Sequence, residues 1–194
     1  MTIADLAAHF PALDSQTPVL IAGPTACGKS RLALQIAKTF GGVVINADAI
    51  QVYGALQILT ARPSMEDERQ LQHLLYGHIT FDHAYSVGQW LREVTPLLHG
   101  GERPIIIGGT GLYFQALTQG LAEIPQISPQ IIARSEQVLA NAGHTALITE
   151  LDAATAARID LHNPMRVQRA WQVLHSTGRG LADWQDATPP PMLR

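Results

Sequence analysis

The chain has little lysine and a single cysteine among its 194 residues. Lys29 and Lys38 are its only lysines, so the other positively charged side chains are arginines, whose forked guanidinium suits paired contacts with phosphate. The lone cysteine, Cys27, excludes an intrachain disulfide and a cysteine-based metal cage. This low cysteine usage fits a reducing compartment, and we expect a cytoplasmic protein.

The sequence also lacks a dominant charge sign and long apolar runs. Its 13 basic and 16 acidic residues give a net charge of −3, so a nucleic-acid partner would have to bind a local basic patch. No apolar run approaches the roughly 20 residues that a membrane-spanning helix needs. The N-terminus lacks the basic start that is typical of a signal peptide. We therefore expect no membrane association.

Short apolar runs alternate with helical periodicity along the first part of the chain. Buried strands are predicted over residues 19–22, 43–47 and 104–107, and helices over residues 2–10, 29–40 and 86–99. A strand, a glycine loop, a helix and a second strand form a βαβ unit, which implies a parallel sheet with right-handed crossovers. The predicted fold class is therefore α/β, with a three-layer parallel sheet like that of P-loop NTPases.

The pattern changes after about residue 122, where only helical periodicity continues. Asn163-Pro164 is a good helix start, because an asparagine cap precedes a proline in the first turn. We interpret residues 1–122 as the α/β core, 123–184 as an inserted helical subdomain and 185–194 as the start of a truncated return to the core. Arg166 and Arg169 share one helix face by their spacing, which fits either a solvated face or a contact surface.

One motif predicts phosphate binding. The sequence fits G-x-x-x-x-G-K-[ST] between a predicted strand and a predicted helix. Its residues are Gly23, Pro24, Thr25, Ala26, Cys27, Gly28, Lys29 and Ser30. Such a loop surrounds an anion with backbone N–H groups, and the helix N-terminus adds partial positive charge. Lys29 would add a full charge, and the Ser30 hydroxyl could ligate Mg²⁺.

Two further loops follow predicted strands. Because the carboxyl ends of parallel strands meet at one edge of the sheet, we expect Asp48 to lie near the phosphate loop. Asp48 could organise Mg²⁺, act as a general base or cap the next helix. Thr110 is the only side chain of the Gly108–Gly111 turn that can form hydrogen bonds. That turn fits either a ligand contact or a tight strand-to-helix connection.

Several sequence blocks, in order, resemble those of the tRNA dimethylallyltransferase (IPP transferase) family. The blocks are Gly23–Ser30, Asn46–Tyr53, Leu59–Pro63, Ala84–Ser86, Gly108–Phe114 and Asn163–Ala170. The resemblance implies transfer of a dimethylallyl group from dimethylallyl diphosphate to N6 of the adenosine just 3′ of the tRNA anticodon. The phosphate loop would then bind the diphosphate, with Mg²⁺ on Ser30.

The resemblance also implies roles for residues outside the phosphate loop. Asp48 would be the general base, Thr110 would contact substrate near the reacting centre, and the target base would be flipped into the pocket. The tRNA-binding residues it implies are Asp48, Ala49, Ile50, Gln51, Thr110, Arg166, Gln168 and Arg169. The expected partners are dimethylallyl diphosphate and the anticodon stem-loop of tRNA, and we expect a monomer.

Two features depart from the family pattern. Met165 stands where family members usually have glutamine, which removes one polar contact with RNA. Family members usually continue well beyond residue 194, so the chain is expected to lack their C-terminal part and to have weak or absent activity. The alternatives are an adenylate isopentenyltransferase acting on free nucleotide, a small-molecule P-loop kinase and an inactive, truncated RNA-binding homologue.

Overall fold

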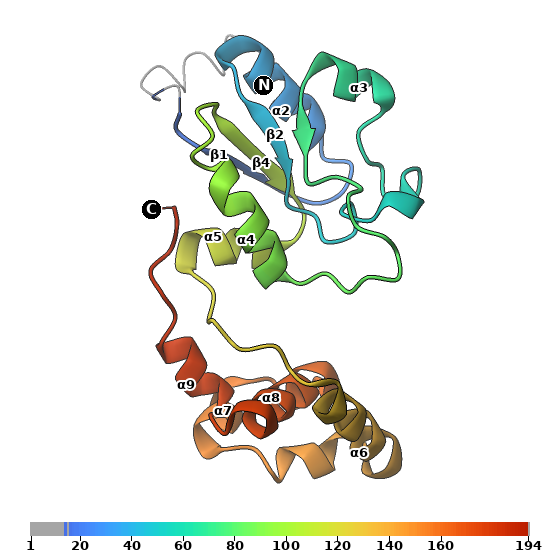
Figure 1. Ribbon diagram of the computed structural model, residues 1–194, viewed down its shortest axis with the longest axis vertical. Helices are drawn as coiled ribbons and strands as arrows, with labels where there is room; N and C mark the ends of the chain where they lie inside the picture. Colours follow the sequence, from blue (N-terminus) through green and yellow to red (C-terminus); the bar gives the residue numbers. More distant parts are fainter. Residues whose placement is uncertain (1–13, 15, 194) are drawn as a thin grey trace. The chain divides into compact units, whose positions relative to one another are not determined.

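The computed structural model describes residues 14 and 16–193, and the predicted helix over residues 2–10 lies outside this part (Figure 1). The chain divides into two compact units. One comprises Met1–Gln119 together with Pro191–Arg194, and the other comprises Gly120–Pro190. Among the described residues, every helix is too short or too polar to cross a bilayer.

The first unit contains a parallel sheet of four strands in the order β1-β4-β2-β3. The strands are β1 (Val19–Ala22), β2 (Val43–Asn46), β3 (His73–Leu74) and β4 (Pro104–Gly108). Ile107 of β4 pairs with Ile21 on one side and with Asn46 on the other. β4 therefore lies between the two strands whose ends carry the phosphate loop and Asp48, although it follows both in sequence.

Helices cover both faces of this sheet. α2 (Lys29–Phe40) buries Ala33 and Ile36 against one face, in a core that includes Ile105. α4 (Val87–Leu97) and α5 (Gly111–Gln119) cover the other face, where Trp90 packs with Ile106. Neighbouring residues of β4 thus face opposite layers, as the alternation of a strand requires. The α/β class and the parallel sheet are confirmed.

Three elements of this unit are too short to show a helical or strand periodicity in the sequence. They are the 3₁₀ turn η1 (Gly54–Leu56), α3 (Met65–Gln70) and the two-residue strand β3. α3 begins with a capping box, in which Asp67 N donates to Ser64 Oγ and Ser64 N donates to Asp67 Oδ2. A segment of this length depends on its cap and on tertiary contacts rather than on helix propensity.

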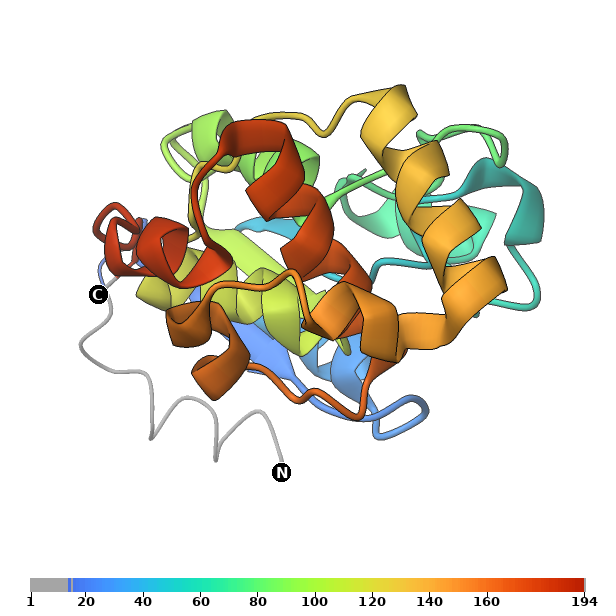
Figure 2. The ribbon, with the colours of Figure 1, turned by 90° about the horizontal axis from the view of Figure 1, so that it is seen from below.

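The second unit is helical. Its helices are α6 (Pro129–Ile148), α7 (Ala153–Arg158), α8 (Pro164–Thr177) and α9 (Leu181–Asp186). α6 is interrupted at Gly143, whose φ of 73° is non-helical. α6 and α8 lie side by side (Figures 1 and 2) and enclose a core of Leu147, Val167 and Trp171. Asn163 caps α8 by accepting from the first-turn amides of Met165 and Arg166.

Candidate active site

The loop Gly23–Ser30 joins the end of β1 to the start of α2. Ala26 and Gly28 have left-handed φ values of 63° and 89°, a backbone conformation typical of loops whose N–H groups surround an anion. Gly28 is the N-cap of α2, and within the described part of the chain no side-chain cap binds its first-turn amides. These amides can therefore donate to a bound anion, as helix N-termini commonly do.

Lys29 holds the loop together from inside. Its Nζ donates to the carbonyl oxygens of Gly23 at 2.8 Å and of Pro24 at 2.6 Å, and it lies 4.0 Å from Cys27 Sγ. These contacts keep the ammonium group within the curve of the loop, next to its backbone amides. The loop thus combines a full positive charge with backbone donors, the combination that binds phosphate groups.

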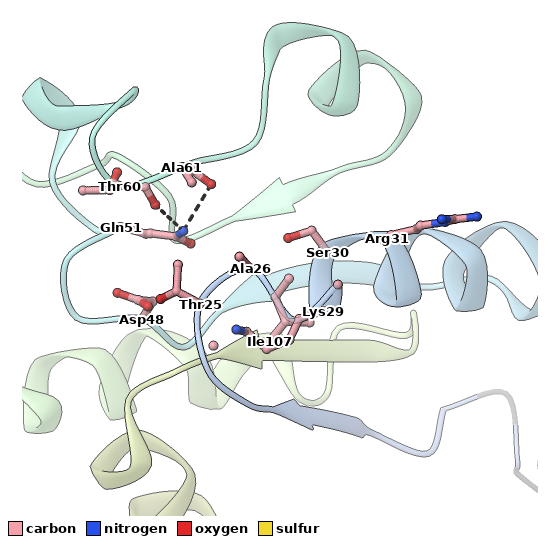
Figure 3. Close-up of a pocket in the computed structure, with 12 residues that line it drawn as sticks. Thr25, Ala26, Lys29, Ser30, Arg31, Asp48, Gln51, Thr60, Ala61 and Ile107 are labelled. Atoms are coloured by element: carbon pink, nitrogen blue, oxygen red, sulfur yellow. Dashed lines mark hydrogen bonds between the residues drawn. The ribbon is translucent and has the colours of Figure 1, made fainter. Parts of the chain in front are cut away.

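A cavity of about 300 Å³ lies between this loop and the ends of the neighbouring strands (Figure 3). Asp48, Gln51 and Ser30 all line it, as the predicted convergence at one edge of the sheet requires. The other lining residues are Thr25, Ala26, Gly28, Lys29, Arg31, Thr60, Ala61, Ile107 and Gly108. The geometry thus places a phosphate loop and a carboxylate around one space.

Asp48 lies in a tight turn directly after β2. Its Oδ1 accepts a hydrogen bond from the Ile50 amide at 3.0 Å. Its backbone N–H donates to the side-chain oxygen of Asn46 at 2.9 Å. The other carboxylate oxygen, Oδ2, has no hydrogen bond among the described residues. One oxygen is thus fixed by the backbone, while the other can accept a proton.

Thr110 contacts the Asp48 turn from the neighbouring strand end. Its Oγ1 accepts from the Ala49 amide at 2.9 Å, and its own amide donates to Ala47 O at 3.3 Å. A Cβ on Gly108 would lie 2.0 Å from that same Ala47 oxygen, so only glycine permits this close approach. In this structure Thr110 supports the turn that carries the carboxylate, and its hydroxyl donates to no group among the described residues.

Gln51 fixes a second wall of the cavity. Its side-chain amide donates to Thr60 O at 2.7 Å and to Ala61 O at 3.3 Å (Figure 3). Ala61 has a left-handed φ of 50°, so these bonds support an unusual backbone conformation. Ala49 is half-buried and packs against the core that contains Trp90, whereas Ile50 has 58% of its surface exposed.

Aromatic side chains on the α4 and α5 side of the sheet support the site. Trp90 Nε1 donates to Asn46 O at 2.7 Å, and its ring stacks on Tyr113 with centroids 4.5 Å apart. Burial, followed by the nearby Tyr53 hydroxyl and the Asp48 and Glu93 carboxylates, raises the pKa of Tyr113 to about 12. The packed tyrosine therefore stays neutral. A tryptophan at helical spacing signalled only a core position, so no sequence signal identified this contact.

The three predicted RNA-binding residues of α8 differ in their exposure to solvent. Arg166 and Arg169 are exposed on the helix. Gln168, by contrast, is buried, and its amide donates to Ser135 Oγ at 3.0 Å. Gln168 therefore differs from the predicted surface position, because the spacing of α8 places it on the buried face of the helix with Val167 and Trp171.

A family model described as IPP transferase matches residues 51–193, and one described as isopentenyl transferase matches residues 17–79. A tRNA dimethylallyltransferase of Cereibacter sphaeroides (strain KD131 / KCTC 12085) is 58% identical, over 95% of this chain and 59% of that protein. That of Ruegeria sp. (strain TM1040) is 56% identical, over 93% of this chain and 62% of that protein. The chain thus spans about three fifths of the length of these relatives.

Two solved structures share the fold. A eukaryotic dimethylallyltransferase acting on tRNA aligns with a TM-score of 0.74 at 24% identity, covering 91% of this chain and 46% of that one. The full-length tRNA isopentenylpyrophosphate transferase of Bacillus halodurans aligns with a TM-score of 0.53 at 31% identity, covering 84% and 56%. The first supports the fold alone, and the second supports the fold and a distant sequence relationship.

Proposed function

The chain belongs to the IPP transferase family, and we propose that it carries the donor-binding and base-bearing part of a tRNA dimethylallyltransferase. The reaction transfers a dimethylallyl group from dimethylallyl diphosphate to N6 of the adenosine 3′ of the anticodon. The observation that carries this proposal is that the phosphate loop and Asp48 line the same cavity. The relatives that share most of this sequence are named for the same activity.

The phosphate loop suits a leaving diphosphate. As the bond between the allylic carbon and the diphosphate oxygen breaks, negative charge grows on that oxygen. The Lys29 ammonium, held at the Gly23 and Pro24 carbonyls, and the uncapped first-turn amides of α2 would stabilise this charge. The allylic group can delocalise the complementary positive charge, so stabilisation of the leaving group lowers the barrier substantially.

Mg²⁺ is the metal that this chemistry implies. No group of three or more His, Cys, Asp or Glu side chains among the described residues is placed to hold a metal ion. Ser30 lines the cavity next to Lys29, which fits an ion carried mainly by diphosphate oxygens with one hydroxyl ligand from the protein. When bound, the ion would supply further charge neutralisation for the diphosphate.

Asp48 is the proposed general base. The N6 lone pair of adenine is delocalised into the ring, so the amine needs help to attack. In the proposed step N6 bonds to the allylic carbon, the carbon–oxygen bond to diphosphate breaks, and an N6 proton moves to Asp48. Oδ2 can accept that proton, since Oδ1 is already bound by the Ile50 amide. Thr110 would contact the substrate from the adjoining turn.

The tRNA would contact both units in separate ways. The target base must leave the anticodon stack to reach the half-buried Asp48 carboxylate in the cavity. Ala49, Ile50 and Gln51 follow Asp48 directly and are proposed to contact the flipped base and its neighbours. The exposed Arg166 and Arg169 are proposed to bind phosphates of the stem, and the buried Gln168 to support their helix. A cytoplasmic location and a monomeric state remain predictions.

A labelled-donor assay tests this function. The chain is incubated with labelled dimethylallyl diphosphate, Mg²⁺ and unmodified tRNA, with AMP and ATP in parallel. Label in tRNA that disappears with Asp48→Ala supports the proposal. Label in AMP alone would indicate a nucleotide-specific transferase, phosphate transfer from ATP would indicate a kinase, and tRNA binding without transfer would indicate an inactive homologue. Each of these three results would contradict the proposed activity of this chain.

A further inference from the structure

Asn46, the last residue of β2, is fully buried and contacts three backbone groups through its side chain. Its Oδ1 accepts from the Asp48 amide at 2.9 Å. Its Nδ2 donates to the Asp48 carbonyl oxygen at 3.0 Å and to the Leu75 carbonyl oxygen at 3.0 Å. The amide therefore binds both backbone polar groups of Asp48, an arrangement that needs a donor and an acceptor on one short side chain.

The contacts of Asn46 also tie the Asp48 turn to two other parts of the fold. Leu75 follows β3 and has a left-handed φ of 60°, unusual for leucine, and its carbonyl oxygen is one acceptor of the Asn46 amide. The backbone oxygen of Asn46 accepts from Trp90 Nε1 on α4. The Asp48 turn is thus anchored to the end of β3 and, through the peptide of Asn46, to α4.

From these contacts we propose that Asn46 is a positioning residue, which fixes the backbone of Asp48 so that its carboxylate meets the acceptor amine in the reactive orientation. This inference rests on the proposed function. Asn46 does not line the cavity and touches no reacting atom; it acts through Asp48. Without it, the Asp48 peptide loses its hydrogen bonds to the Asn46 side chain, and the carboxylate gains freedom that slows proton transfer.

Substitution of Asn46 distinguishes a role in positioning Asp48 from a role in fold stability alone. In Asn46→Ala we expect kcat for prenyl transfer to fall about tenfold or more, while KM for dimethylallyl diphosphate stays within about twofold. The matched control is Ser86→Ala, which removes the cap of α4 in the same unit (Gln89 N to Ser86 Oγ, 3.2 Å) and should leave kcat unchanged. A wild-type kcat in Asn46→Ala would overturn the inference, as would an equal fall in both variants.

A shorter polar variant covers the case in which Asn46→Ala does not fold. Asn46→Ser keeps a hydroxyl but cannot reach the carbonyl oxygens of Asp48 and Leu75 together, so the same loss of kcat at constant KM is expected. An Asn46→Ser variant with wild-type kcat would overturn the inference.

Hydrogen exchange of backbone amides tests the positioning role of Asn46 without an activity assay. It therefore remains informative if the wild-type chain transfers no prenyl group, a result that would refute only the proposed function. The readout is the exchange of the Ala49 and Ile50 amides, which donate to Thr110 Oγ1 and Asp48 Oδ1 and not to Asn46. We expect exchange at least about tenfold faster in the Asn46 variants than in wild type or Ser86→Ala. Unchanged exchange at both amides would overturn the positioning role.

Discussion

Thr110 and Ala49 join two strand ends that are far apart in sequence. The Ala49 amide donates to Thr110 Oγ1 at 2.9 Å, and so connects the turn after β4 to the turn that carries Asp48. The same turn is held by Asn46 from the side of β2. The proposed base is therefore supported from two strands, and the hydroxyl of Thr110 has a structural task besides any contact with substrate.

Replacing Thr110 tests this support. In Thr110→Val the Ala49 amide loses its acceptor while the side-chain volume is kept, so the free energy of unfolding should fall by about 1–3 kcal/mol. Thr110→Ser retains the hydroxyl and should lose much less. Urea denaturation of both variants measures the difference, and equal stabilities of Thr110→Val and wild type would show that the bond contributes nothing.

Substitution of each of the two lysines tests whether the phosphate loop is the anion-binding site. Lys29→Ala removes the charge inside the loop, so the dissociation constant for inorganic pyrophosphate should rise by about tenfold or more. Lys38 lies in the last turn of the same helix, where it is exposed and donates to Gln70 Oε1, so Lys38→Ala should leave pyrophosphate binding unchanged. Isothermal titration measures both, and similar affinities for the two variants would exclude the loop as the anion site.

Glycine substitutions test the close approach of β4 to the Asp48 segment. Gly108→Ala places a methyl group 2.0 Å from Ala47 O, so we expect the free energy of unfolding to fall by about 3 kcal/mol or more. Gly111→Ala has open space around its new Cβ at the start of α5 and should change stability by less than about 1 kcal/mol. Thermal unfolding followed by circular dichroism compares them. A tolerated Gly108→Ala would mean that the two strand ends can separate at little cost.

The ion pair between α7 and α9 predicts a pH dependence for the helical unit. Arg158 donates to Asp186 Oδ1 at 2.6 Å and Oδ2 at 2.9 Å, and these bonds lower the pKa of Asp186. A lowered folded-state pKa stabilises the fold above the unfolded value of about 3.9, and this contribution is lost as the pH falls through the folded value. Wild type and Asp186→Asn should therefore differ in melting temperature at pH 7 and converge near pH 2. A difference that persisted at pH 2 would require another cause.

The exposed arginines of α8 predict a salt-dependent interaction with RNA. Arg166→Ala and Arg169→Ala should each weaken binding of an anticodon stem-loop and reduce the slope of log K against log salt by about one. Gln168→Leu should instead alter stability, because its amide is bound to Ser135 inside the unit. Arg69→Ala, on the exposed surface of α3, is the control. Fluorescence anisotropy across a salt series measures RNA binding by all four variants. Unchanged salt slopes for both α8 arginine variants would exclude direct phosphate contacts.

The sequence alone determined the features that depend on local pattern. The phosphate loop, α2 and the start of α8 are specified by glycine positions, apolar periodicity and capping residues within a few positions of one another. The convergence of Asp48 with the phosphate loop also followed from sequence, since strand ends of a parallel sheet meet at one edge.

Only the tertiary structure decided which side chains support the site and which face solvent. The side-chain amide of Asn46 donates to Leu75, just after β3, and to the Asp48 turn, and its backbone oxygen accepts from Trp90 of α4. No local sequence pattern encodes the partners Leu75 and Trp90. The burial of Gln168 was likewise not predictable from local sequence, because its contact with Ser135 of α6 depends on how two helices pack. A motif can specify a loop within itself, but a hydrogen-bond network is completed only when distant segments come together.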